Sequence, residues 1–240
     1  MRPDTSRSVF LDAPTPDPRS ISAPPAGWES TREALHALAE SVVAPARKAV
    51  DGRIRLRWLP GGFGTPRFGD GRQIRVEGCE LVVVEGGCSR RRAITSCRDA
   101  AAFVGLDPAG LPAESLTVDA EAARWLGAFY AFALAVLEDL RGVVEADEPV
   151  LWPEHFDYAI TAGDEAGGSR ANYGASPGDE QHPEPYLYVG PWRPREGPLW
   201  NADSFAGAEL DLSALLACGD PRARALEFYV ERARELDGTS

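Results

Sequence analysis

A run of thirteen uncharged residues, from Trp125 to Leu137, lies inside a longer segment with the composition of an α-helix. The helix is predicted from about Asp119 to Val143. A bilayer span needs about 20 consecutive apolar residues, so this run is too short to cross a membrane. A helix that is apolar on every side is normally surrounded by protein. The rest of the chain must therefore supply strands and helices that cover this one.

Segments with alternating apolar and polar residues stand on both sides of this helix and predict β-strands. In residues 53–58, arginines alternate with Ile54, Leu56 and Trp58, and a Gly-rich loop follows at 60–71. Short Gly-containing links between neighbouring segments favour hairpins, and therefore antiparallel pairing. The other strands are predicted at 72–76, 80–85, 89–95, 155–161, 170–176 and 186–190.

Amphipathic helices are predicted near both ends of the chain. Ser30 and Glu33 form a capping box for the first of them, and Pro45 is expected to kink it. Asp220 followed by Pro221 begins the last helix. The predicted fold class is therefore α+β, with antiparallel β-sheets (meanders) packed around a long buried helix and amphipathic helices at the N- and C-terminal ends.

The domain organisation is predicted from the distribution of proline. Residues 1–29 hold six of the 20 prolines and no sustained apolar period, which indicates a proline-rich extended arm. Residues 30–240 are predicted to form a single α+β domain. Two half-domains, 30–110 and 111–240, are the alternative.

The composition excludes several kinds of partner. The 37 acidic and 25 basic residues give a net charge of −12, so we expect no nucleic acid and no membrane surface as a partner. Lys48 is the sole lysine beside 24 arginines, a usage that GC-rich codons produce, so a high-GC bacterial source is expected. The N-terminus has no leader-like apolar segment, which predicts a cytoplasmic location.

Three motifs in the C-terminal part resemble segments of other proteins. They are LWPEHFD at 151–157, NYGASPGD at 172–179 and PEPYLYVGPW at 183–192. With these motifs, residues 150–240 resemble a family of uncharacterised bacterial proteins of unassigned function. The resemblance implies a common fold, and it implies no activity or catalytic residue.

The densest group of polar side chains is predicted in residues 154–184. On a strand, His155 and Asp157 are two residues apart and share one face of the sheet. The hairpin brings Asn172 toward that face, and the next loop carries His182. Imidazole and carboxylate groups together suit Zn²⁺, Fe²⁺ or Mn²⁺. The candidate ligands of a divalent metal are His155, Asp157, His182, Glu180 and Glu184.

The same region also has the composition of a polar ligand-binding site. Tyrosine and tryptophan are frequent between residues 152 and 200, and buried tyrosine hydroxyls need hydrogen-bond partners, which favours a cavity with a wet edge. The alternative without a function is that the acids beside Gly and Pro are solvated turn residues. The candidate ligand-binding residues are His155, Asp157, Asn172, His182, Tyr186 and Tyr188.

Arginines form the other candidate site. Arg53, Arg55 and Arg57 alternate along the first predicted strand, and Arg75 is expected to join them across the sheet. Guanidinium groups bind phosphate or carboxylate in a bidentate way. The alternative is a solvated sheet face, or pairing with residues 101–240, which hold nine arginines and 25 acids.

Three functions follow from these features. The favoured one is a small-molecule-binding domain with an aromatic pocket and a rim of histidine and carboxylate. The first alternative is a metal-dependent enzyme, a hydrolase or oxygenase, that uses His155, Asp157 and His182. The second is a protein-interaction subunit.

Overall fold

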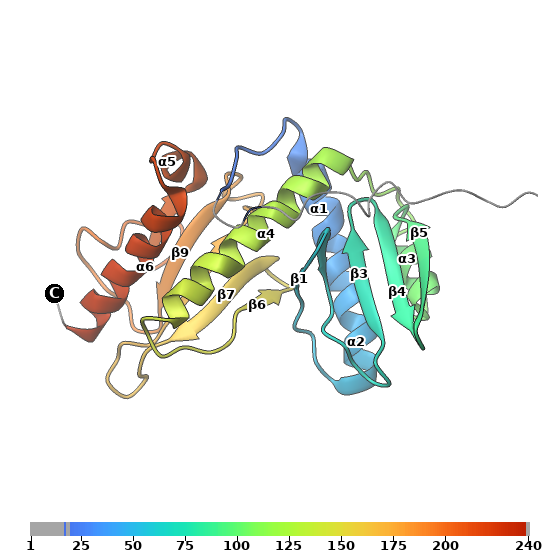
Figure 1. Cartoon of the computed structure of the whole chain (residues 1–240), viewed down its shortest axis with the longest axis horizontal. Coiled ribbons are helices and arrows are strands. Elements are labelled where there is room, and N and C mark those ends of the chain that lie inside the picture. Colours follow the sequence, from blue (N-terminus) through green and yellow to red (C-terminus); the bar gives the residue numbers. More distant parts are fainter. Residues whose placement is uncertain (1–16, 18–19, 239–240) are drawn as a thin grey trace, which may run out of the picture.

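The computed structural model describes residue 17 and residues 20–238, so most of the predicted arm lies outside the described residues. Two five-stranded antiparallel sheets and the helices around them make up the fold, which confirms the α+β class (Figure 1). The first sheet has the order β1-β2-β3-β4-β5, from Arg57–Leu59, Gly62–Gly64, Gln73–Glu77, Glu80–Glu85 and Cys88–Ala93. The second has the order β10-β9-β8-β7-β6, from Ala208–Asp211, Tyr186–Pro191, Ala171–Ser176, Asp157–Ala162 and Val150–Trp152.

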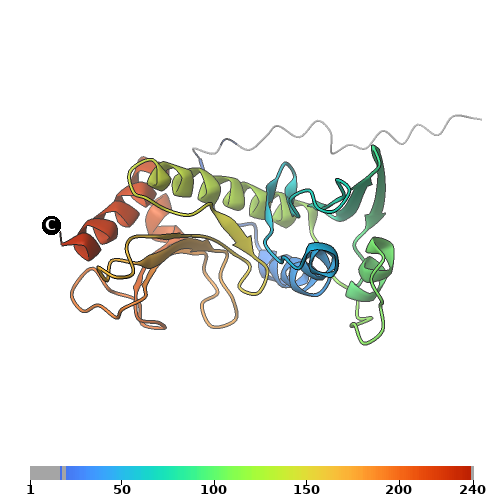
Figure 2. The same cartoon turned by 90° about the horizontal axis from the view of Figure 1, so that it is seen from below.

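Each sheet is covered by its own helices on one side. Helices α1 (Trp28–Leu38) and α2 (Ala44–Asp51) run behind the first sheet in Figure 1, with α3 (Cys97–Val104) beside them. In Figure 2, α4 (Ala120–Arg141) and α6 (Pro221–Asp237) lie along one side of the second sheet. On the other side of that sheet lie its connecting loops. The second sheet therefore has one face that no helix covers among the described residues. The short α5 (Leu212–Leu216) precedes α6.

Helix α4 is the central element, as its uncharged run predicts. Asp119 caps it by accepting hydrogen bonds from the backbone N–H groups of Glu121 and Ala122, both at 2.9 Å. By length and composition alone the helix could span a membrane, but 67% of its most apolar stretch is buried inside the protein. It crosses both sheets, contacting β1 and β2 of the first and β7 and β8 of the second. Its burial is therefore that of a core helix.

The two sheets come together at Leu56 and Leu151. Leu56 and Leu151 exchange backbone hydrogen bonds of 3.0 and 3.2 Å, which places β1 beside β6. One hydrophobic cluster contains core residues of both sheets and of α4. The two halves thus share their core.

The first helix differs from its prediction at its start, near Ser30, and before Pro45. It begins at Trp28, within the residues predicted as the arm, and the Ser30 hydroxyl donates to the Gly27 carbonyl instead of capping the helix. Residues Ala39–Val43 form a π-helical turn in which the Ala44 N–H bonds to the Ala39 carbonyl. Pro45 lacks an N–H and its ring clashes with the carbonyl four residues before it, so a wider turn accommodates it. A π-helical turn thus precedes Pro45, where the sequence predicts a kink.

Candidate functional site

The side of the second sheet that no described helix covers, here called the outer face, carries most of the predicted ligand-binding residues. Alternate residues of a strand point to opposite sides, and Tyr158 and Tyr173 are buried on the side of α4 and α6. The residues that alternate with these tyrosines along β7 and β8, and their cross-strand partners on β9 and β10, therefore point to the other side. The polar and aromatic residues of the outer face therefore include Asp157, Asn172, Ser176, Tyr186, Tyr188, Glu209 and Asp211, with Gly174 between them.

Asp157 is the most deeply buried acid on the outer face. It is only 5% exposed, and its Oδ2 atom accepts a hydrogen bond from the Tyr188 hydroxyl. Its Oδ1 atom is buried and has no hydrogen-bond partner among the described residues. Burial raises the pKa of this carboxyl, and the bond from Tyr188, the charge of His155 and the backbone N–H of Asp157 itself only partly oppose that effect. A buried carboxylate oxygen without a donor is costly, and it needs an explanation.

Two further tyrosines approach Asp157 from the core side of the sheet. The Tyr130 hydroxyl donates to the Phe156 carbonyl at 2.6 Å, and the Tyr229 hydroxyl donates to the Gly174 carbonyl at 2.7 Å. Burial, followed by the negative charge of Asp157, raises the pKa of both hydroxyls well above 10.0. These tyrosines are neutral near pH 7, so they add no charge that would balance or repel the carboxylate.

Tyr188 reaches Asp157 because the neighbouring strand has no side chain in its way. A Cβ atom at Gly174 would lie 2.4 Å from Cζ of Tyr188, so the ring rests directly on the glycine backbone. Phe205 holds the ring from another side, edge-on, with centroids 6.2 Å apart. Burial raises the pKa of the Tyr188 hydroxyl well above 10.0, and Asp157 adds to this, so the hydroxyl remains a donor.

A second polar group follows along the outer face toward β10. His182 stacks on Tyr186 with ring centroids 4.1 Å apart. Its Nε2 lies 3.2 Å from Oδ1 of Asp211, and its Nδ1 lies 3.7 Å from Oε2 of Glu209. Burial raises the pKa of Glu209, and His182 opposes that shift. Tyr186 and Tyr188 of β9 thus lie between Asp157 on one side and Glu209 and Asp211 on the other.

His155 does not share the outer face with Asp157 as predicted. It is exposed in the turn between β6 and β7, and the strand begins at Asp157. Phe156 between them has φ of 54°, a left-handed conformation that bulky residues rarely adopt. Its ring is buried, stacked on His36 with centroids 5.1 Å apart. The turn breaks the two-residue period, so His155 lies before strand β7, whereas the sequence places it on the strand.

The remaining predicted metal ligands are also dispersed. Glu180 is exposed, and the Glu184 carboxylate accepts a 2.7 Å hydrogen bond from the Ser213 N–H at the start of α5. Asn172 lies on the outer face, where its Oδ1 accepts from Thr161 at 3.0 Å and from Trp192 at 3.3 Å. Within residues 17 and 20–238, no three His, Cys, Asp or Glu side chains are grouped to hold a metal ion. The predicted metal set therefore does not converge.

The four predicted anion-binding arginines are divided between two places. Arg75 pairs with Glu77 at 2.8 Å, and Glu77 also pairs with Arg91 at 2.7 Å. Arg53, Arg55 and Arg57 instead line a cleft between the two sheets. Only Arg57 of these three is in a strand, because β1 begins there.

Sequence reasoning missed the acidic residues of β10 and the tyrosines behind Asp157. The alternation Glu209-Leu210-Asp211 after Gly207 is a strand signal, but it is four residues long and easily taken for a loop. Tyr130 and Tyr229 lie on helices and read as ordinary core residues.

Comparison of the chain with protein families, curated proteins and solved structures finds no match. The resemblance of residues 150–240 to a bacterial family therefore has no counterpart in these comparisons. Function must be inferred from the geometry of the sites.

Proposed function

We propose that the protein is a binding domain whose outer face takes a small organic cation carrying a planar apolar group. The observation that carries this proposal is the Oδ1 atom of Asp157, which is buried and has no hydrogen-bond donor within residues 17 and 20–238. An ammonium group placed there would supply both the missing hydrogen bond and the missing positive charge. Hydrogen bonds between charged groups are worth about 1.5–3 kcal/mol, more than neutral ones.

The surroundings of Asp157 support a cation over an anion. The chain between residues 101 and 240 has nine arginines and 25 acids, and Glu209 and Asp211 belong to the same face. The rings of Tyr186 and Tyr188 lie side by side, with centroids 6.1 Å apart. Aromatic faces attract cations, by about 0.5–2 kcal/mol for each well-placed ring. Charge and π-surface thus favour the same class of ligand.

Calorimetric titration with benzylamine, and with benzyl alcohol as its neutral counterpart, tests this proposal. The wild-type protein is expected to bind benzylamine and to bind benzyl alcohol at least about tenfold more weakly, a difference of about 1.4 kcal/mol. Asp157→Asn keeps the shape and removes the charge, so it should abolish that preference. Asp70→Asn, at an exposed turn of the first sheet, is the matched control and should leave it unchanged.

The pH dependence of binding follows from the raised pKa of Asp157. An ammonium group binds the ionised carboxylate, so affinity should fall as the pH drops through the pKa of this group. The proposal is wrong if the two probes bind equally, if neither binds, or if Asp157→Asn retains the preference for benzylamine.

A further inference from the structure

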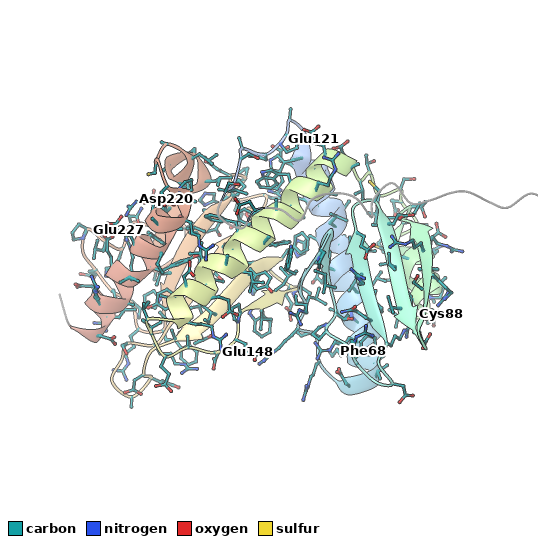
Figure 3. The ribbon with its side chains drawn as sticks, in the orientation of Figure 1. Phe68, Cys88, Glu121, Glu148, Asp220 and Glu227 are labelled. Atoms are coloured by element: carbon teal, nitrogen blue, oxygen red, sulfur yellow. The ribbon has the colours of Figure 1, made fainter. Side chains whose placement is uncertain are left out.

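A cleft of about 780 Å³ lies where the two sheets meet, on the side of the C-terminal half of α4. Glu148 lies on its rim and is labelled between the two halves in Figure 3. Typical small-molecule sites have volumes of about 300–1,000 Å³. Five arginines line the cleft: Arg47, Arg53, Arg55, Arg57 and Arg141.

Three of these arginines have partners that fix their positions. Arg47 is buried and donates to Asp51 at 3.2 Å and to the Arg55 carbonyl at 2.6 Å. Arg141 pairs with Glu138 at 2.7 Å. The Arg55 guanidinium lies over the ring of Trp152, 5.6 Å from its centroid. Carboxylates thus balance the charges of Arg47 and Arg141, and packing on Trp152 holds the Arg55 guanidinium in place.

Arg53 and Arg57 are different. Both are exposed, and their guanidinium groups make no hydrogen bond or ion pair with any residue that the structure describes. Arg75 and Arg222, by contrast, pair with carboxylates, at 2.8 and 2.7 Å. Two unpaired guanidinium groups in one cleft therefore make it locally positive within an acidic protein.

Apolar groups lie beside these charges. Leu56, Val150 and Tyr158 are buried core residues of the lining, and Leu134 and Pro149 beside them are partly exposed. Their surfaces give an organic group of a ligand something to pack against, while the arginines hold its charged end. Glu138 and Glu148 are the acids in the lining, and Glu138 is already paired with Arg141.

We propose that this cleft binds a small organic phosphate, with the phosphate group held by Arg53 and Arg57 and the organic group against Leu134 and Pro149. Guanidinium groups bind phosphate oxygens bidentately, and a dianion matches two unpaired cations. The site takes a ligand of opposite charge to the one proposed for the outer face. It is independent of that proposal, because none of its arginines belongs to the second sheet.

Calorimetric titration with phenyl phosphate at low ionic strength tests the cleft. Wild-type protein is expected to bind it saturably with a stoichiometry of one. Arg53→Gln with Arg57→Gln should weaken binding at least about tenfold, or about 1.4 kcal/mol. Arg53→Lys with Arg57→Lys keeps the charges and loses the bidentate geometry, so it should give an intermediate affinity.

Arg90→Gln with Arg92→Gln is the matched control. It also removes two positive charges, but from the exposed strand β5, where both guanidinium groups lie over Phe103. Phenyl phosphate binding should be unchanged in this variant. Loss of binding in the control to the same degree would show general electrostatic attraction, and it would overturn the proposal. Absence of saturable binding to the wild type would overturn it as well.

Discussion

At the scale of single residues, Asp157 carries a cost that the fold itself does not explain. Its carboxylate is buried, and one oxygen has no donor among the described residues. Buried polar groups of this kind are rare, and strained or unsatisfied groups concentrate at functional sites. Phe156, directly before it, has a left-handed backbone conformation that adds a second local cost. Two unfavourable features at adjacent residues support a functional reading of this turn.

The pH dependence of stability should show the cost of Asp157. Burial raises the pKa of the folded-state carboxyl above its ordinary value of 3.8, so the folded protein binds this proton more tightly than the unfolded chain does. Stability is therefore lost as the pH rises from 3.8 through the folded-state pKa. Asp157→Asn should be more stable than wild type at neutral pH, and the difference should shrink as the pH falls toward 3.8.

Urea unfolding of both proteins over a series of pH values measures this difference. A difference that does not change with pH would contradict the raised pKa. If the variant gains stability and loses benzylamine binding, stability and function are opposed at this residue.

Gly174 makes a second prediction at this scale. A methyl group there would lie 2.4 Å from the Tyr188 ring, so Gly174→Ala must displace the ring and break its bond to Asp157. Overpacking and loss of the bond should lower the unfolding free energy by about 1–3 kcal/mol and weaken benzylamine binding. Gly190→Ala is the control, because its methyl would meet no atom within 4 Å. Equal effects of the two substitutions in thermal unfolding would contradict this account.

At the scale of elements, the strength of the local signal determines what the sequence can predict. Helix α4 and the start of α6 agree with their predictions, because the capping residues Asp119 and Asp220 and long patterns act together. Strands β3, β4, β8 and β9 also agree with their predictions, because each has five or six residues and so a long enough alternating pattern.

Short elements are the ones that escape prediction. Strand β2 (Gly62–Gly64) lies in a segment predicted as a loop, and it is a strand because β3 pairs with it. Strands β6 and β10 have three and four residues and depend equally on their neighbours. At the candidate site, Asp157, Tyr186 and Tyr188 could be placed from periodicity. His155 could not, because no local signal announces the conformation of Phe156.

Close packing of α4 on β2 gives a prediction for an element. A Cβ atom at Gly127 would lie 3.3 Å from the backbone of Gly62, and Trp58 donates to the Gly127 carbonyl at 3.0 Å. Gly127→Leu should push α4 from the first sheet and lower the unfolding free energy by about 2 kcal/mol or more. Arg124→Leu, at an exposed position of α4, serves as the control. The packing account fails if chemical denaturation shows the two variants to be equally stable.

At the scale of the whole molecule, charge divides the protein into unlike parts. Residues 51–100 have ten arginines and six acids, whereas residues 101–240 have a large acidic excess. The acidic part bears the outer face, and arginines between the sheets form the cleft. Strand β7 links the two, because Asp157 points to the outer face and Tyr158 lines the cleft. A single strand thus contributes neighbouring residues to two sites of opposite charge.

The most direct test of the central claim is to measure the titration of Asp157 itself. Carbon-detected NMR of its carboxyl group, with Asp157→Asn for assignment, follows ionisation with and without benzylamine. We predict a pKa above 3.8 in the free protein, and a lower pKa when benzylamine is bound, since a cation stabilises the ionised form. A pKa near 3.8 that benzylamine does not change would contradict the claim that this buried carboxylate binds a cation.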